Sequence, residues 1–269
     1  MLVDAARAWP HRPLTSVGYR YARYAGGGSK PVRVGTLRSG SEIELDLSQW
    51  QHLEIFFHGT LDEPVTALLR NMARPGWTFF DVGANEGYYA FLAADLGGSG
   101  SKVVAFEPQA AVASLLRASV NRNRTPVTVV EAACVAEGES ITFYASDDRT
   151  NLGAGTVVPG LHKGEGTSVR AVTLDKYCTD SGLVPDIVKI DVEGFELYVL
   201  RGFTETLAAR PPALILAEIT DDARFPSHRE VEGFLAGFGY EAHRVGSEGE
   251  LLPFDAPCGL ENIAFMLRS

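Results

Sequence analysis

The chain has 269 residues, of which 45% are hydrophobic, and a formal net charge of −10 at pH 7. That amount of apolar material can form one large domain with a continuous core, with a small appendage beside it. The acidic balance argues against nucleic acid as a partner, because binding to a phosphate backbone draws much of its free energy from cationic surface.

The first 75 residues are predicted to form an N-terminal arm, a hairpin and a helix. Residues 1–31 show no apolar segment typical of a secretory signal, and a Gly-rich linker ends this arm. The runs 32–38 and 42–47 flank a short turn, and the second alternates apolar and acidic residues, which predicts a hairpin with one exposed face. A helix is expected over 61–72, with Asp62 as its N-cap.

Residues 76–269 are predicted to form the second and larger domain, in which strands and helices alternate. Strands that are apolar on both faces, with helices between them, indicate a parallel sheet covered by helices, which is an α/β fold. The last two strands have no helix between them and are expected to pair antiparallel. We expect helices at 86–96, 110–120 and 229–238, with one ending at Leu200, and strands at 77–82, 102–106, 127–130, 140–145, 168–174, 186–192, 213–219, 240–245 and 262–267.

No stretch of the chain approaches the ~20 apolar residues that a bilayer crossing needs, so we expect no membrane partner. Cysteine use gives a further indication of the compartment. Cys134, Cys178 and Cys258 are widely spaced and form no CxxC pair, which argues against a disulfide framework and a zinc knuckle. A cytoplasmic protein is therefore expected.

A glycine turn follows the first strand of the larger domain, at the junction where an α/β sheet binds its ligands. The turn reads Asp81-Val82-Gly83-Ala84-Asn85-Glu86-Gly87-Tyr88-Tyr89. Its G-x-x-x-G spacing differs from the G-x-G-x-x-G of dinucleotide-binding turns. Asp81 would repel a pyrophosphate, and it suits a ligand with a cationic end, such as the ammonium of a methionine moiety.

A second acidic residue, Glu107, ends the next strand. An acid in that place can accept hydrogen bonds from both hydroxyls of a ribose. Because nicotinamide and adenosyl cofactors share this feature, the pair of acids predicts a nucleoside cofactor without choosing between them. The alternative is that Asp81 and Glu107 only cap the ends of their strands.

Three charged residues, Lys189, Asp191 and Glu193, occupy alternate positions at the end of an otherwise apolar strand. Alternation places Lys189 and Asp191 on one side of the strand, whereas Glu193, beyond the strand end, either joins them or turns away. They form either a buried ion network or a group that acts on a ligand, and we favour the second. Asp191 is the first candidate for the catalytic acid or base, with Lys189, Glu193 and Glu218 as further catalytic candidates.

A divalent metal is a weaker alternative at this place. If the strands that end at Asp191 and Glu218 are neighbours, their carboxylates can share a hard ion such as Mg²⁺ with acceptor oxygens. Asp221 and Asp222 would complete the ligand set, or they form a solvated turn. Two carboxylates alone are a thin ligand set, so we assign no metal.

Together these motifs resemble the FkbM family of S-adenosylmethionine-dependent methyltransferases. The resemblance rests on 81–89, 105–108, Asn121 and above all Val188-Lys189-Ile190-Asp191-Val192-Glu193-Gly194-Phe195-Glu196 with 199–202, and it covers roughly 77–245. It implies a class I methyltransferase (Rossmann-like) fold, whose seven-stranded, mostly parallel sheet has an antiparallel terminal strand. It also implies that Ala132 and Ala133 border the adenine, and that the cofactor is contacted by Asp81, Gly83, Ala84, Asn85, Gly87, Tyr88, Glu107, Pro108, Ala133 and Asp191.

We therefore predict an S-adenosylmethionine-dependent O-methyltransferase that acts on a small hydroxylated acceptor, a sugar or natural product of secondary metabolism. One rival is an NAD(P)-dependent oxidoreductase, which shares the ribose carboxylate but needs a third glycine and a Tyr-x-x-x-Lys pair that this sequence does not place suitably. The other rival is a non-catalytic adenosyl-binding protein.

The segments expected to meet the acceptor carry the least pattern. The Gly-rich loop 151–166 is either a lid that faces the acceptor, with His162 as a weak candidate base, or a plain connection. Tyr19, Tyr21 and Tyr24 of the arm would cover the acceptor or a second subunit, so a homodimer is one expectation, and a frayed surface segment is the other.

Overall fold

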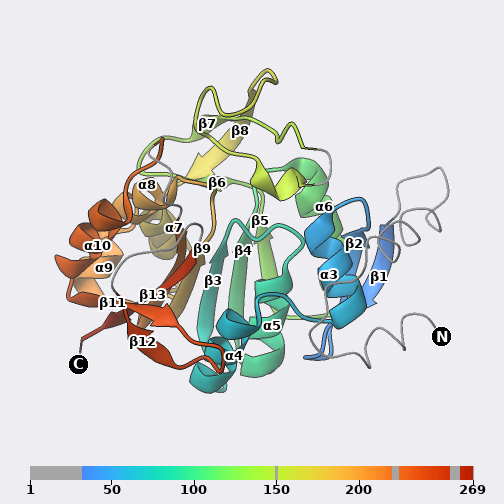
Figure 1. Ribbon diagram of the computed structural model, residues 1–269, viewed down its shortest axis with the longest axis horizontal. Coiled ribbons are helices and arrows are strands. Elements are labelled where there is room, and N and C mark those ends of the chain that lie inside the picture. The colour runs from blue at the N-terminus through green and yellow to red at the C-terminus, as the bar shows by residue number, and fades with distance from the viewer. Residues whose placement is uncertain (1–31, 149–150, 220–223, 255–260, 269) are drawn as a thin grey trace.

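The protein has a central sheet with helices packed on both of its faces (Figure 1). This computed structural model describes residues 32–148, 151–219, 224–254 and 261–268. Within these residues, the main sheet has eight strands, and their order confirms the predicted α/β class. Across the sheet the strands are β12 (Leu251–Pro253), β11 (Tyr240–Val245), β13 (Glu261–Leu267), β10 (Leu214–Ile219), β9 (Ile187–Ile190), β3 (Thr78–Val82), β4 (Lys102–Phe106) and β5 (Val127–Val130).

The directions of the strands agree with the expected pattern. Strands β10, β9, β3, β4 and β5 are parallel, and β13 lies antiparallel between β10 and β11. The expected seven strands are present, and β12 adds an eighth at the edge by pairing antiparallel with β11. This three-residue strand is exposed throughout, so it has no hydrophobic alternation that sequence reasoning can detect.

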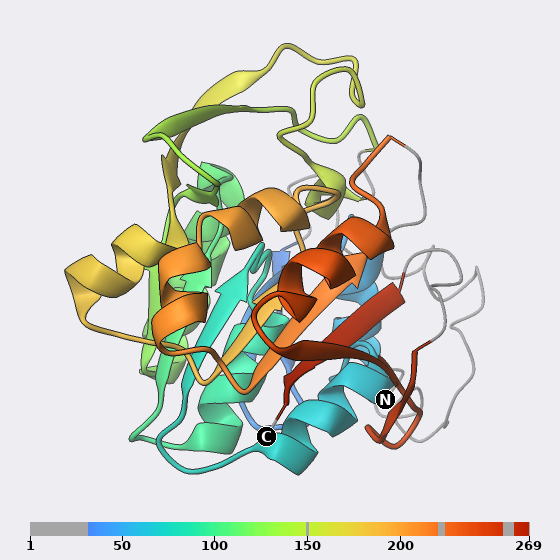
Figure 2. The ribbon, with the colours of Figure 1, turned by 90° about the vertical axis from the view of Figure 1, so that its left-hand side faces the viewer.

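Alternate residues of each parallel strand contribute to two separate hydrophobic cores. Phe79 packs on the side of α3 (Trp50–His58), α4 (Glu63–Met72), α5 (Tyr88–Gly97) and α6 (Ala110–Asn123). Its neighbour Phe80 packs on the side of α7 (Leu174–Ser181), α8 (Glu196–Arg201), α9 (Thr204–Ala209) and α10 (His228–Ala236). Figure 2 shows α7 to α10 in front of the strands. Among the helices that the structure describes, none is both long and apolar enough to cross a lipid bilayer.

The N-terminal part packs against the larger domain. The predicted hairpin is present as β1 (Val32–Thr36) and β2 (Glu42–Asp46), whose Ile43 and Leu45 are fully buried. These side chains belong to the same core as Phe91 of α5. The division of the chain at residue 75 stays a prediction.

In the first part of the chain one helix was missed, and the role of one predicted capping residue is corrected. Helix α3 was not predicted, because its buried Leu53, Ile55 and Phe57 alternate at period two, which is a strand-like spacing. Asp62 stands at the N-cap position of α4 but its side chain makes no cap hydrogen bond. Instead its Oδ2 accepts a hydrogen bond from Asn262 Nδ2 at 2.9 Å, so Asp62 ties α4 to β13.

A smaller sheet lies above the carboxyl ends of the parallel strands (Figure 1). It consists of β6 (Ala133–Cys134), β8 (Thr167–Val172) and β7 (Ser140–Phe143), and the segment between β7 and β8 includes the short 3₁₀ helix η1 (Leu152–Ala154). Strand β8 ends at Val172, before the predicted 174, because Thr173 caps α7 by accepting the N–H of Lys176 at 3.1 Å. This small sheet brings loop 151–166 over the edge of the main sheet.

Candidate active site

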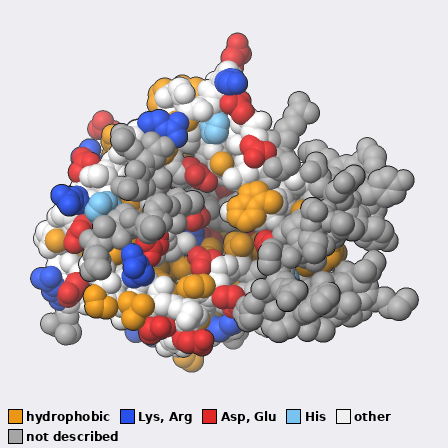
Figure 3. All heavy atoms as spheres, viewed as in Figure 1, with side chains coloured by type: hydrophobic (Ala, Val, Ile, Leu, Met, Phe, Trp, Pro, Cys, Tyr) orange, Lys and Arg blue, Asp and Glu red, His pale blue; other side chains and the backbone are white. Residues whose placement is uncertain are grey.

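A cavity of about 720 Å³, open to solvent, lies at the carboxyl ends of β3, β4, β9 and β10. In Figure 3 acidic side chains are set in a hollow on this face, beside a hydrophobic patch. Most of the predicted site residues line it, namely Gly83, Asn85, Glu107, Pro108, Ala132, Ala133, Asp191, Glu193 and Glu218. The other predicted residues, Asp81, Ala84, Gly87, Tyr88 and Lys189, lie behind this lining and are buried or nearly so.

The glycine turn wraps closely around the end of β9. Gly83 has a φ of +82°, and a Cβ placed on it would lie 1.8 Å from the carbonyl oxygen of Asp191. A side chain is therefore excluded there on two grounds, left-handed backbone and lack of space. Asn85 has a φ of +50°, and its backbone N–H donates to Glu107 Oε2 at 3.0 Å, which connects the turn to the acid that ends β4.

Glu107 is held in a fixed orientation at the floor of the cavity. Its Oε1 accepts the backbone N–H of Gln109 at 2.8 Å, and only 4% of the residue is exposed. Burial raises the pKa of Glu107 to about 7. Each carboxylate oxygen has two lone pairs, so one backbone donor per oxygen leaves room for two hydroxyl donors from a ligand.

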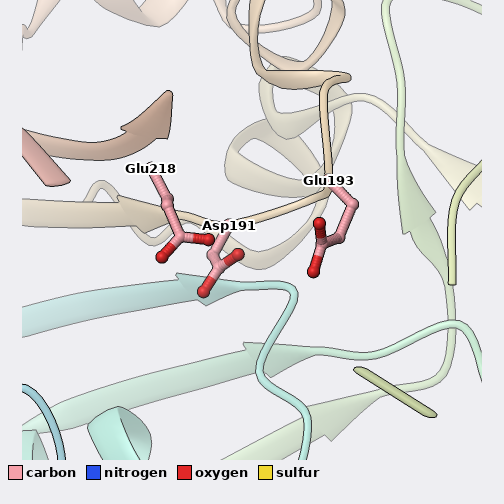
Figure 4. A group of neighbouring side chains, drawn as sticks. All are labelled: Asp191, Glu193 and Glu218. Atoms are coloured by element: carbon pink, nitrogen blue, oxygen red, sulfur yellow. The ribbon is translucent and has the colours of Figure 1, made fainter. Parts of the chain in front are cut away.

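Three carboxylates converge on the cavity from β9 and β10. One oxygen each of Asp191, Glu193 and Glu218 lies within 4.8 Å of the others, and Figure 4 shows Asp191 and Glu218 side by side, with Glu193 next to them. Burial and the nearby charge of Asp191 raise the pKa of Glu218 to about 9. Burial, followed by the charge of Asp191, raises the pKa of Glu193 to about 7. The raised pKa favours the protonated form of Glu218, which can donate a hydrogen bond.

The end of β9 differs from the expected strand. The strand stops at Ile190. Lys189 and Asp191 still lie on one side, as predicted, since Lys189 Nζ donates to Asp191 Oδ2 at 2.8 Å, whereas Glu193 belongs to the turn that follows. Glu193 has a φ of +54° and Gly194 a φ of +93°, which turns the chain and directs the Glu193 carboxylate toward Asp191. A Cβ on Gly194 would lie 2.1 Å from Phe225 Cδ1, so this turn also has no space for a side chain.

Lys189 lies beneath the carboxylates. Only 1% of it is exposed, its Nζ donates to Asp191 Oδ2 at 2.8 Å, and the same atom lies 4.5 Å from the centroid of the Tyr89 ring. Burial alone would lower the pKa of Lys189, but the charges of Asp191, Asp81 and Glu218 raise it above its ordinary value. Lys189 therefore stays charged and fixes the orientation of Asp191 from below.

Asp81 also lies below the cavity. It pairs with Lys189 across β3 and β9, only 1% of it is exposed, and burial raises its pKa to about 7. Within the described residues, its Oδ2 has no hydrogen-bond partner. Asp81 does not line the cavity, and its expected contact with an ammonium group stays a prediction. Tyr88 likewise points away, and its hydroxyl lies 3.0 Å from Thr60 Oγ1 and 2.8 Å from Thr66 Oγ1.

Loop 151–166 contributes to the wall of the cavity. Gly153, Gly155 and Thr156 line it, and Thr156 Oγ1 donates to the carbonyl oxygen of Glu193 at 3.1 Å. His162 does not line it, and its Nε2 lies 2.7 Å from the carbonyl oxygen of Ala154, within the loop. The predicted contributions of Asp221, Asp222, Tyr19, Tyr21 and Tyr24, and the position of Cys258, lie outside the described residues.

Sequence reasoning missed the contribution of α3. Gln51 lines the cavity, and its Oε1 lies 3.5 Å from Asn85 Nδ2. The next residue, His52, is buried, and its Nε2 lies 3.1 Å from Glu86 Oε2 of the glycine turn. These contacts join segments 34 residues apart in the sequence (52 and 86), so no local pattern indicates them.

A glycine turn follows β3, an acid ends β4, and an antiparallel strand lies between the last parallel strand and β11. This arrangement is that of class I S-adenosylmethionine-dependent methyltransferases. Residues 81–242 match the model of the methyltransferase FkbM domain, which is more than half of the chain. The chain belongs to the FkbM methyltransferase domain family.

Individual relatives are more distant. The chain is 32% identical over 153 residues to the hexuronic acid methyltransferase AglP of Haloferax volcanii, across 54% of this chain and 58% of that protein. A methyltransferase FkbM structure from Methylobacillus flagellatus KT has 16% identity and a TM-score of 0.45, covering 72% of this chain and 44% of that one. An S-adenosylmethionine-dependent methyltransferase from Agrobacterium tumefaciens has 8% identity and a TM-score of 0.49, covering 88% and 70%.

Proposed function

We propose that the protein transfers a methyl group from S-adenosylmethionine to a hydroxyl of a small molecule, with a sugar or a natural product as the acceptor. The observation that carries this proposal is the meeting of Asp191, Glu193 and Glu218 in the same cavity as Glu107. The first three can serve the acceptor end, and Glu107 the nucleoside end. A relative that is a hexuronic acid methyltransferase supports a sugar as the class of acceptor.

The residues of the cavity fit the cofactor. Glu107 retains acceptor capacity for two ribose hydroxyls, and the small side chains of Ala132 and Ala133 leave a flat wall beside it for an adenine. When bound, S-adenosylmethionine supplies a methyl group activated by a cationic sulfur. A set of carboxylates favours that cation, whereas a phosphate-bearing dinucleotide would be repelled. Together with the family, this argues against the nicotinamide alternative.

Each carboxylate of the cluster has a distinct role in this proposal. An alcohol must lose its proton as it gains the methyl group, and a carboxylate within hydrogen-bond reach can accept that proton. Asp191, held by Lys189 at 2.8 Å, is the first choice for this base. Glu193, whose pKa is about 7, stands beside it and is the second choice. Protonated Glu218 donates a hydrogen bond that orients Asp191 or the acceptor oxygen.

Positioning carries much of the rate in such a transfer, because the two reacting atoms must be held in line about 3 Å apart with water excluded. Phe143, Val157 and Phe195 add apolar wall to the cavity around these carboxylates. Loop 151–166, which supplies Val157, is therefore proposed as the cover of the acceptor end.

A metal is not needed for this chemistry. The three carboxylates supply the oxygen atoms that Mg²⁺ prefers. However, Lys189 Nζ already donates to Asp191 Oδ2 at 2.8 Å, so an ion would compete with this lysine for the carboxylate. We therefore propose transfer without a metal.

The test uses S-adenosylmethionine with a ¹³C-labelled methyl group, incubated with the protein and an extract of its source organism. We expect a new labelled product whose methyl carbon has the NMR shift of a methoxy group, and no such product with Asp191→Asn. A labelled methyl group on nitrogen or carbon would contradict O-methylation, and an undiminished product with Asp191→Asn would contradict the role of that carboxylate.

A further inference from the structure

Helix α3 borders the cavity proposed for the cofactor, although it lies outside residues 81–242, which match the family. Its Gln51 lines the cavity, and Gln51 Oε1 lies 3.5 Å from Asn85 Nδ2 of the glycine turn. The helix itself is firmly seated, because Ile55 is fully buried in the same core as Phe91 of α5. Helix α3 is therefore a fixed support beside the glycine turn.

The residue after Gln51, His52, is buried and has a defined tautomer. Its Nδ1 accepts the backbone N–H of Asp46 at 2.9 Å, which leaves a ring proton on Nε2. This Nε2 lies 3.1 Å from Glu86 Oε2, and the two side chains are only 6% and 4% exposed. Within the described residues no aligned hydrogen-bond donor reaches Glu86 Oε2, so its contact with the His52 ring is electrostatic. A buried carboxylate depends on such a contact, because leaving it uncompensated is costly.

Glu86 stands between two residues whose backbone is left-handed. Asn85 has a φ of +50° and Gly87 a φ of +92°. A residue other than glycine adopts this conformation only where its surroundings hold it there. One such restraint is the hydrogen bond from the backbone N–H of Asn85 to Glu107 Oε2, at 3.0 Å. The contact of Glu86 with His52 is a second restraint, at the next residue of the turn.

The turn borders open space on the side of His52. A second cavity, of about 950 Å³, is lined by Asn85, Glu86 and His52 among others. Gln51, Asn85 and Gly153 line both cavities and separate them. Open space supplies no van der Waals contact to the turn. On this side the position of Glu86 therefore depends on its contact with His52.

We propose that His52 is a positioning residue for the cofactor, which acts through Glu86 on the glycine turn. The inference rests on the proposed function, since both take S-adenosylmethionine as the cofactor. With the contact in place, Asn85 presents its N–H to Glu107, and Glu107 keeps the orientation in which it accepts the ribose hydroxyls. Without the contact, the buried carboxylate of Glu86 shifts toward water and Asn85 shifts with it, so the cofactor binds more weakly.

Two substitutions of His52 separate its two contacts. In His52→Gln the amide nitrogen takes the place of ring Nε2, so the contact with Glu86 remains and the hydrogen bond with Asp46 is lost. In His52→Asn the amide oxygen takes the place of Nδ1, so the hydrogen bond with Asp46 remains and the contact with Glu86 is lost. Each variant loses one buried contact, so stability alone does not distinguish them.

The assay is calorimetric titration of the full chain with S-adenosylhomocysteine, on variants that urea denaturation shows to be folded. We expect the dissociation constant to rise about tenfold in His52→Asn and less than about threefold in His52→Gln. His58→Asn is the matched control and should bind as the wild type does, because His58 pairs with Glu54 of its own helix, at 3.5 Å. Equal constants for His52→Asn and His52→Gln would overturn the proposal, whether both rise or neither does.

A double-mutant cycle tests the path through Glu86. Glu86→Gln removes the buried charge, and in that background His52→Asn should raise the dissociation constant less than about twofold. A rise of about tenfold in both backgrounds would overturn the proposal, because His52 would then act without Glu86.

The wild type distinguishes this inference from the proposed function. A wild type that does not bind S-adenosylhomocysteine would refute the proposed function and the inference with it. Binding that is equally strong in the wild type and in His52→Asn would refute the inference alone.

Discussion

Replacement of Lys189 by methionine tests whether the charge beneath the active site organises it. Lys189→Met keeps the length of the side chain and leaves Asp81 and Asp191 without their counter-ion. Removal of one partner from a buried ion pair costs roughly 3–5 kcal/mol, because the remaining charge is uncompensated. We expect a loss of about this size in the free energy of unfolding at pH 8, measured by urea denaturation.

The loss should depend on pH in a defined direction. Asp81 has a folded pKa of about 7, above that of the unfolded chain, so it destabilises the protein as the pH rises through that range. Without Lys189 the folded pKa of Asp81 rises further. Lowering the pH from 8 to 6 then protonates Asp81 and stabilises the variant over the whole interval, whereas it stabilises the wild type only below about pH 7. One carboxyl shifted in this way makes the penalty about 1.4 kcal/mol smaller at pH 6 than at pH 8.

Lys176→Met is the matched control, because Lys176 is an exposed lysine that pairs with Asp180 on its own helix. Its free energy of unfolding should be nearly that of the wild type at both pH values. A penalty for Lys189→Met under about 1 kcal/mol at pH 8, or one that is equal at both pH values, would refute the reasoning.

Three further results follow from the geometry of the cavity. Glu107→Gln should weaken S-adenosylhomocysteine at least about tenfold in calorimetry, because it removes the charge that accepts the ribose hydroxyls, and an equal affinity would refute that role. Gly83→Ala should abolish cofactor binding, since its Cβ would overlap the Asp191 carbonyl. Gly98 also has a positive φ but has open space around it, so Gly98→Ala should retain binding. Equal behaviour of the two variants would contradict the steric argument. The affinity for S-adenosylmethionine relative to S-adenosylhomocysteine should rise from pH 6 to pH 8, because Glu193 ionises near pH 7 and then attracts the sulfonium, and a constant ratio would argue against it.

The strands and their directions could be predicted because the parallel strands are continuous apolar runs. Lys102–Phe106 and Val127–Val130 have the predicted bounds, and the acids at the ends of β3 and β4 were identified because strand ends are where ligands bind. Asp81 does not line the cavity, because it lies further back along β3, buried beside Lys189 of β9. The sequence indicates where a strand ends without showing how deep each of its side chains lies.

Other parts of the site depend on contacts between distant segments, and those have no local signature. The contact of His52 with Glu86 exists only because α3 packs beside the glycine turn, and the spacing of α3 resembles that of a strand. The turn at Glu193 requires a positive φ in a residue other than glycine. The surrounding structure imposes this backbone conformation, and the amino-acid sequence does not indicate it.

The central claim is that the cavity at Glu107 and Asp191 binds an adenosyl cofactor and no dinucleotide. Calorimetric titration of the full chain with S-adenosylhomocysteine and, separately, with NADH tests it most directly. We predict saturable binding of one S-adenosylhomocysteine per chain, lost in Gly83→Ala, and no heat of binding with NADH. Saturable binding of NADH together with no binding of S-adenosylhomocysteine would contradict the assignment of this cavity.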